Sequence, residues 1–282
     1  RRSINNLFAS YQELVGQGWH LDVIVESQPA STDIALPVVA LRSPHSGPAL
    51  WLISGIHGEE PAGPNAISNA IDDIAALGKQ YPVVLMPLLN PHGYVRNWRY
   101  LNVPVYSATI EGQSVGDSSH VLPDPNNPGA ARARASSDEA AGISRYILKM
   151  LSVYPPRYSI DLHEDNLVSE GYVYSQGVLG AADPFAAEAV KVFRDNNIGV
   201  RMSGKTRFNE EIVDGIIGPV VDSSIDEFMS ADLVIDDGRK IAGPGASTVL
   251  VFETPAENQS LEQRVDAHVQ LIRRVLQLIG GQ

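Results

Sequence analysis

The chain has 282 residues, of which 44% are hydrophobic and 19% charged, so it is long enough to bury a sizeable core. Its formal charge of −12, with only 21 Lys and Arg, argues against nucleic-acid binding, because phosphate contacts require clustered basic side chains. The absence of cysteine excludes disulfides and thiol chemistry, and no window approaches the roughly 18 uninterrupted apolar residues of a membrane span.

Apolar spacing and turn residues predict the elements in chain order, beginning with an amphipathic helix. The predicted helices span residues 4–15, 61–77, 136–151, 181–196, 225–229 and 260–279. The predicted strands span residues 21–26, 34–41, 49–54, 82–89, 158–162, 171–175 and 248–252. Residues 90–135 form a long stretch rich in Pro, Gly, Asn and Ser without periodicity, and loops of that length are usually functional or disordered.

Helices alternate with short apolar strands along the chain, which predicts an α/β sheet covered by helices on both faces. We find no break in composition and no internal repeat, so we predict one domain over residues 1–282. The chain begins with Arg1 rather than Met. We predict a cytoplasmic location and leave a periplasmic location and the oligomeric state open.

Chemically reactive side chains follow several of these strands. His57 and Glu60 come just after the strand at 49–54, His163 ends the strand at 158–162, and Glu253 ends the strand at 248–252. Ligands of open α/β sheets bind beyond the carboxyl ends of the strands. We therefore expect these four side chains to meet at one edge of the sheet.

Two imidazoles and one carboxylate are the ligand set of a catalytic zinc site whose fourth position is open. We predict that His57, Glu60 and His163 bind one Zn²⁺ ion. A hydrolytic centre also needs a base that takes a proton from water, and Glu253 is the candidate. An arginine suits the place where negative charge develops on the former carbonyl oxygen.

Each of these signals is weak alone. A lone H-x-x-E pattern often arises by chance, and an isolated His163 or Glu253 at a strand end would more often be an ordinary buried or solvated side chain. Their weight comes from four such signals in one order, each at the end of a strand.

Five segments carry a resemblance to a known family: His57-Gly58-Glu59-Glu60, Asn90-Pro91-His92-Gly93, Arg96-Asn97-Trp98-Arg99, Asp161-Leu162-His163 and Phe252-Glu253-Thr254-Pro255. In this order they resemble the motifs of the zinc carboxypeptidase family of carboxypeptidase A type. The resemblance covers about residues 50–255. It implies a mixed, mostly parallel eight-stranded sheet with helices on both faces.

The resemblance also implies roles for single residues. It makes His57, Glu60 and His163 the zinc ligands and Glu253 the general base and acid. Arg99 takes the place of the arginine that polarises the scissile carbonyl, and Arg96 is a secondary candidate for substrate contact.

One departure concerns the substrate's terminal carboxylate, which the family holds with the Asn and Arg of a D-x-N-R stretch. The best match here is Asp117-Ser118-Ser119-His120, so Ser119 and His120 stand where the family has Asn and Arg. We assign them to substrate binding, although His cannot reproduce the bidentate grip of Arg on a carboxylate. Asp117 matches an Asp that hydrogen-bonds a zinc-bound His in the family.

The sequence therefore predicts a zinc-dependent hydrolase that cleaves a peptide or peptide-like amide bond. The first alternative is an N-acyl amino acid deacylase, similar to the aspartoacylase and succinylglutamate desuccinylase relatives that share the H-G-x-E and D-L-H signals. The second is a zinc-binding protein without catalysis. A second metal near Glu164 and Asp165 stays open.

Overall fold

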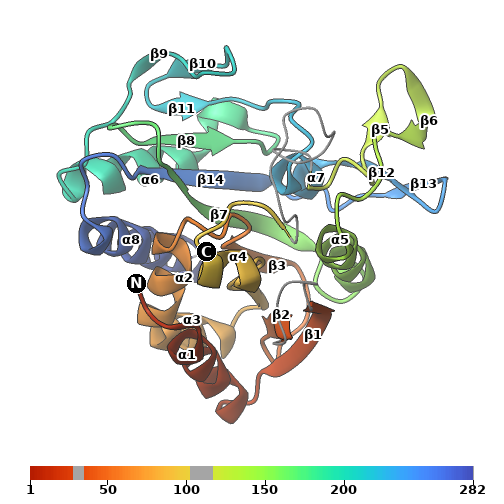
Figure 1. Cartoon of the computed structure of the whole chain (residues 1–282), viewed down its shortest axis with the longest axis horizontal. Helices are drawn as coiled ribbons and strands as arrows, with labels where there is room; N and C mark the ends of the chain where they lie inside the picture. The colour runs from red at the N-terminus through yellow and green to blue at the C-terminus, as the bar shows by residue number, and fades with distance from the viewer. Residues whose placement is uncertain (28–34, 102–116, 282) are drawn as a thin grey trace.

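The computed structural model describes residues 1–27, 35–101 and 117–281, which form an α/β structure (Figure 1). Its largest sheet has ten strands. From one edge to the other they are β1 (His20–Ser27), β2 (Leu36–Arg42), β4 (Val83–Met86), β3 (Ala49–Ser54), β7 (Pro156–Asp165), β14 (Thr248–Pro255), β8 (Tyr172–Ser175), β11 (Ile216–Ile217), β10 (Glu211–Val213) and β9 (Ser203–Lys205).

The sheet is mixed, as predicted, but it is larger than the eight strands expected. The central strands β4, β3, β7 and β14 run parallel to one another. Toward the edges the pairs are antiparallel except for β8 with β11, so "mostly parallel" describes only the centre. Three of the ten strands, β9, β10 and β11, are not among the seven predicted from apolar spacing, because they are too short to show a periodic pattern in the sequence.

Helices cover both faces of the sheet, which confirms that part of the fold prediction (Figure 1). One face packs against α1 (Ile4–Gly16), α2 (Ala62–Asn69), α3 (Ile71–Gly78), α6 (Pro184–Asp195) and α8 (Leu261–Gly280). The other face packs against α5 (Asp138–Met150) and α7 (Ile225–Ser230). The remaining elements are α4 (Pro91–Arg96), a 3-10 turn (Gly180–Ala182) and two small sheets formed by β5 (Pro123–Asp124) with β6 (Asn127–Ala131) and β12 (Leu233–Asp236) with β13 (Arg239–Ala242).

Two predicted elements have different bounds in the structure. The helix expected over 61–77 is two helices, α2 and α3, which meet at Ala70. The strand expected over 158–162 is longer and includes His163 within β7. The prediction of one domain stays a prediction. No helix in the described ranges is both long and apolar enough to cross a membrane.

Strand β7 shows how the sheet separates core from site. Its side chains alternate between faces, and Ile160 and Leu162 pack into the core formed with α2, α6 and α8. Ser159, Asp161 and His163 point to the opposite face and are also buried. Polar side chains buried at the centre of a sheet are costly unless they have partners, so their presence marks this face as the functional one.

Candidate metal centre and its cavity

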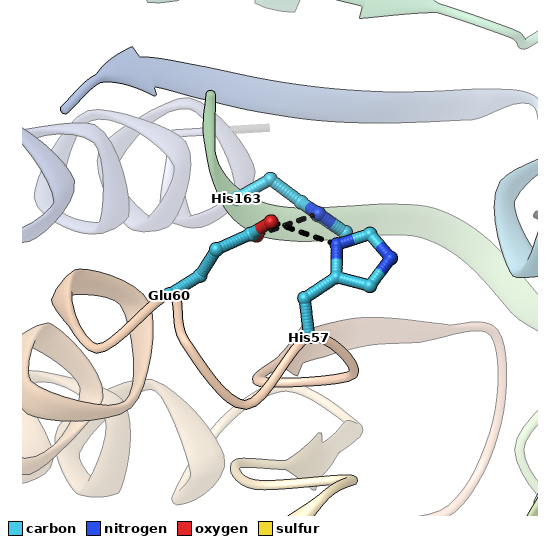
Figure 2. Close-up of side chains that lie close together, drawn as sticks. All are labelled: His57, Glu60 and His163. Atoms are coloured by element: carbon cyan, nitrogen blue, oxygen red, sulfur yellow. Dashed lines mark hydrogen bonds and ion pairs between the residues drawn. The ribbon is translucent and has the colours of Figure 1, made fainter. Parts of the chain in front are cut away.

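The three predicted metal ligands meet at the carboxyl ends of two neighbouring parallel strands (Figure 2). His57 and Glu60 lie in the turn that follows β3, and His163 lies near the end of β7. Nδ1 of His57 is 2.8 Å from Oε1 of Glu60, and Nδ1 of His163 is 3.1 Å from Oε2 of the same carboxylate. One ligand atom from each residue lies within 4.8 Å of the other two. This convergence fits a single metal ion held by two imidazoles and a carboxylate.

The charges at this centre also fit a metal. Burial lowers the pKa of His57 to about 4, so its imidazole is neutral at pH 7, as a metal ligand must be. Burial alone would lower the pKa of His163, but the negative charges of Asp161 and Glu60 raise it well above the usual value. A divalent cation held by the same side chains would replace that proton and satisfy the same carboxylates.

The turn between His57 and Glu60 requires a glycine at position 58, because another segment of backbone lies against it. A Cβ at Gly58 would lie 2.1 Å from the carbonyl carbon of Gly93 and 2.4 Å from the backbone oxygen of Trp98. Asn90 holds the same region together, since its Oδ1 accepts from Gly93 N and its Nδ2 donates to Arg99 O. The segments at residues 57–60 and 90–93 therefore pack closely, backbone against backbone.

Arg99 lies beside the metal ligands. Its Nη1 donates to Glu59 Oε1 at 3.0 Å and to Glu60 Oε1 at 2.8 Å. Although burial lowers the pKa of Arg99, the charges of Glu60 and Glu59 raise it above its ordinary value, so the guanidinium keeps its charge. A fixed positive charge thus stands at the edge of the proposed metal site.

Glu253 is placed beside His163 by the register of the sheet, since the two residues are direct neighbours on the parallel strands β14 and β7. Burial raises the pKa of Glu253 to about 8, and the charges of Glu60 and Asp165 act in the same direction. A metal ion bound next to it would lower this pKa toward neutrality. Such a carboxyl group can both accept and return a proton near neutral pH.

Asp161 stands behind His163. Its Oδ2 lies 3.1 Å from Nε2 of His163, and Asp161 is fully buried. Asp161, His163 and Asp226 also bring one oxygen or nitrogen each within 4.8 Å of one another. A carboxylate at the second nitrogen of a ligating imidazole fixes its tautomer and orientation. The family resemblance implies Asp117 for this task, whereas the structure places Asp161 in direct reach of His163.

A cavity of about 630 Å³ opens in front of these residues. Six of the nine predicted site residues line it: His57, Glu60, Arg99, Asp117, His163 and Glu253. Arg96, Ser119 and His120 are not among its lining residues in the described part of the chain. Arg96 is exposed at the end of α4, Ser119 is buried, and the pKa of His120 is lowered by burial and by the charge of Arg145.

Sequence reasoning gave no role to several residues of the cavity. They are Tyr172, Tyr174, Glu210, Asp222 and Asp226, with aliphatic walls from Val220, Val221, Ile225 and Val251. The period-two pattern around residues 171–175 could have indicated that Tyr172 and Tyr174 share one face of β8. Asp222 comes from a stretch without periodicity, and Asp226 lies in the short helix predicted over 225–229, but neither position carried a signal that placed it near β7.

Arg207 also lines the cavity, and its Nη1 is 3.3 Å from Oδ1 of Asp165. A smaller cavity of about 400 Å³ adjoins the first and shares Asp165, Tyr172, Arg207 and Phe208 with it. Arg201 and Lys205 line the smaller cavity as well, so positive charge gathers on that side.

Glu164 and Asp165, considered for a second metal, already have donors around them. Glu164 accepts from the backbone N–H of Ala62 and from the guanidinium of Arg264. Asp165 accepts from the hydroxyl of Tyr172 at 2.7 Å and from the backbone N–H of Leu167. These contacts give both carboxylates a structural role without a second ion.

Known proteins were then compared with this chain. No protein-family model matches the sequence, and no curated protein matches it. Solved structures do match. A candidate metallopeptidase from Shewanella baltica has a TM-score of 0.76 at 22% identity, over 98% of this chain and 92% of the other.

Two further solved structures match over almost the whole chain. A metallo-carboxypeptidase from Burkholderia cenocepacia has a TM-score of 0.62 at 12% identity, over 99% of this chain and 70% of the other. Bovine thrombin-activatable fibrinolysis inhibitor has a TM-score of 0.62 at 13% identity, over 99% and 97%. The chain has a zinc carboxypeptidase-like fold. The resemblance stated from the sequence is confirmed at this level, with the candidate metal group at the predicted residues.

Proposed function

We propose that the protein is a zinc-dependent amide hydrolase of carboxypeptidase type. The observation that carries the proposal is the joint position of three possible zinc ligands and Glu253 at the mouth of one cavity, on neighbouring parallel strands. Metal binding alone would not need Glu253 next to His163. The substrate class is a peptide or an acylated amino acid.

His57, Glu60 and His163 would hold the zinc ion. When bound, the ion supplies the Lewis acidity that makes water nucleophilic near neutral pH and polarises a carbonyl. Glu253 would take a proton from the attacking water and deliver it to the leaving nitrogen, so that water and amide become a carboxylic acid and an amine. The raised pKa of Glu253 suits a group that must hold this proton between the two steps.

Arg99 would stabilise the negative charge that develops on the carbonyl oxygen. In the structure its guanidinium is shared between Glu59 and Glu60. A cation bound to Glu60 would compete with Arg99 for that carboxylate and leave Glu59 as its partner. Arg99 could then turn one N–H toward the substrate without losing its anchor.

Arg96, Ser119 and His120 stay in the proposal as substrate contacts outside the cavity wall. Asp117, by contrast, lines the cavity.

The test is a hydrolysis panel with zinc-loaded protein, protein treated with a chelator, and chelated protein given zinc again. The panel contains peptides, the same peptides as C-terminal amides, and N-acyl amino acids, so that it also separates a carboxypeptidase from a deacylase. Activity should disappear on chelation and return with zinc.

The matched variant is Glu253→Gln, which keeps the size of the side chain and removes the base. We expect roughly a 10²–10⁴-fold loss of kcat, as for other general acid–base groups, with zinc binding retained. A fully active Glu253→Gln variant would overturn the assignment. Tight zinc binding with no turnover on any substrate would favour a non-catalytic zinc protein instead.

A further inference from the structure

Two arginines outside the cavity, Arg1 and Arg2, lie near the turn that carries two of the proposed metal ligands. Ser3, which follows them, caps α1 by accepting a hydrogen bond from a backbone N–H of that helix. The backbone of Arg2 is held on both sides, because its N–H donates to Asn65 Oδ1 at 2.8 Å and its carbonyl accepts from the hydroxyl of Tyr94 at 2.8 Å. Contacts with α1, α2 and α4 thus fix where the two arginine side chains begin.

The guanidinium of Arg1 donates to three oxygens. Its Nη2 donates to the carbonyl oxygen of Gly58 at 3.1 Å and to that of Tyr94, and its Nη1 donates to Asn97 Oδ1 at 2.6 Å. The same group lies over the ring of Tyr94, with Cζ 4.2 Å from the ring centre, a distance at which a cation is attracted to the aromatic face. Although Arg1 as a residue is exposed, these contacts hold its charged end in one place.

The three oxygens belong to two segments that carry the candidate site. Gly58 lies between the proposed ligands His57 and Glu60. Asn97 is the C-cap of α4, and Arg99 follows it by two residues. The two segments also contact each other directly, because the N–H of Gly58 donates to Arg99 O at 3.4 Å. The guanidinium of Arg1 therefore joins the turn with the metal ligands to the segment with Arg99.

The carbonyl of Gly58 depends on this contact. Gly58 is buried, and within the described ranges Arg1 is the only hydrogen-bond donor to its oxygen. A buried carbonyl that loses its donor destabilises the backbone conformation that keeps it there. Removal of the guanidinium should therefore loosen the turn, and with it the positions of His57 and Glu60.

We infer that Arg1 is a positioning residue of the metal centre. It holds the turn at residues 57–60 and the segment at residues 94–99 together, so that the ligand atoms and Arg99 converge. The part that concerns Arg99 rests on the proposed function. The part that concerns the turn requires only that the three ligands bind a metal ion.

Arg2 provides a matched control. Its guanidinium donates to Ser68 Oγ at 2.8 Å and to Asn69 Oδ1 at 2.5 Å, and both acceptors lie in α2. Neither acceptor belongs to the turn or to the segment with Arg99. Arg2→Met removes one positive charge next to Arg1 and leaves the backbone hydrogen bonds of Arg2 in place.

The first experiment measures zinc affinity by competition with a chromophoric chelator for wild type, Arg1→Met and Arg2→Met. Methionine keeps an unbranched side chain and removes the donors. We expect Arg1→Met to bind zinc about three- to tenfold more weakly, the effect of losing hydrogen bonds from a charged but partly exposed group. Arg2→Met should stay within about twofold of wild type. Equal affinity in wild type and Arg1→Met, or an equal loss in both variants, overturns the inference.

Arg1→Lys tests the fork of donors, since lysine keeps the charge but has a single ammonium group. Its zinc affinity should lie between those of wild type and Arg1→Met. If Arg1→Met does not fold, the comparison of wild type with Arg1→Lys decides, and equal zinc affinities in these two overturn the inference.

The second experiment measures kcat and KM at saturating zinc, on a substrate that wild type hydrolyses. Because Arg99 would act on charge that develops during the reaction, Arg1→Met should lower kcat by about three- to tenfold with little change in KM, and Arg2→Met should change neither. A raised KM with unchanged kcat would overturn the part that concerns Arg99. Weaker zinc binding in Arg1→Met, with no hydrolysis by wild type of any substrate, supports the positioning of the turn and counts against the proposed function.

Discussion

On the strand side of the cavity, Glu60, Glu164 and Asp165 each pair with an arginine, whereas Glu253 does not in the described chain. On the α7 side, none of Asp117, Asp222 and Asp226 forms an ion pair within the described ranges. Both sides are acidic and both line the same space. The difference lies in whether the protein itself supplies the compensating charge.

This difference separates two uses of a carboxylate. Where the chain supplies a cation, the geometry is fixed before any ligand arrives, as preorganised catalytic groups require. Where it does not, the folded protein carries the electrostatic cost of burying the carboxyl groups. Functional sites commonly hold such a cost at the expense of stability.

The largest effect should follow from turning a paired carboxylate into an unpaired one. Glu164 is buried and is held by Arg264 of α8 and by the N–H of Ala62, so Arg264→Met leaves the buried carboxylate with only a neutral donor. We expect the free energy of unfolding to fall by about 3–5 kcal/mol at pH 8, as for other broken buried pairs. Urea unfolding measures this change.

The same helix offers a matched control in Arg273, which pairs with Asp73 at the surface. Arg273→Met should cost no more than about 1 kcal/mol, because water screens an exposed pair. If the two variants lose the same free energy of unfolding, the buried pair of Glu164 and Arg264 contributes no more than a surface pair. The ion pairs on the strand side of the cavity would then not set it apart from the α7 side.

The strands that the sequence predicted well are the buried ones, because burial gives them a continuous apolar run. The strands at 49–54 and 248–252 are continuous apolar runs, and β3 and β14 have the predicted starts. β9, β10 and β11 have two or three residues each and are held by pairing with neighbours rather than by a pattern of their own. A sequence pattern cannot show an element that only tertiary contacts define.

The candidate site divides in the same way. His57, Glu60, His163 and Glu253 were found because each stands at the end of a buried strand, where the topology brings them together. Asp222 and Asp226 reach the cavity because α7 packs across β7 and β14. The short helix predicted over 225–229 corresponds to α7, but the sequence gave no signal for where it packs. Part of the loop at 90–135, residues 102–116, lies outside the described residues.

A smaller effect concerns Asp161, which contacts the proposed metal ligand His163 and has no arginine partner in the described chain. Asp161→Asn keeps its size and removes the charge that orients the imidazole. We expect zinc affinity to fall by roughly 10–100-fold, the range seen when such orienting carboxylates are changed. Competition with a chromophoric chelator measures the affinity.

The same titration on Asp117→Asn decides between the two carboxylates proposed to orient a zinc-bound histidine. If Asp117→Asn weakens zinc binding and Asp161→Asn does not, the role belongs to Asp117, as the family resemblance implies. Equal affinity in wild type and both variants would show that neither carboxylate orients the ligand.

The smallest effect tests whether the aspartates on the α7 side, Asp117, Asp222 and Asp226, lower the stability of the folded protein. Burial, together with the charges of Asp222 and Asp161, raises the pKa of Asp117 from 3.8 to about 7. Between pH 3.8 and about pH 7, Asp117 is protonated in the folded protein and ionised in the unfolded chain. The contribution of Asp117 to stability is therefore full below about pH 4 and is lost as the pH rises through 7.

Asparagine at position 117 has no proton to lose, so the stability of Asp117→Asn relative to wild type should increase with pH over this window. We expect an advantage of roughly 1 kcal/mol at pH 8 for the metal-free protein, because Asp117 is partly exposed and solvent screens it. Urea unfolding of both proteins at pH 5, 6, 7 and 8 measures the difference. An advantage that is absent or that shrinks toward pH 8 would mean that Asp117 has a compensating partner, and the two sides of the cavity would then be alike.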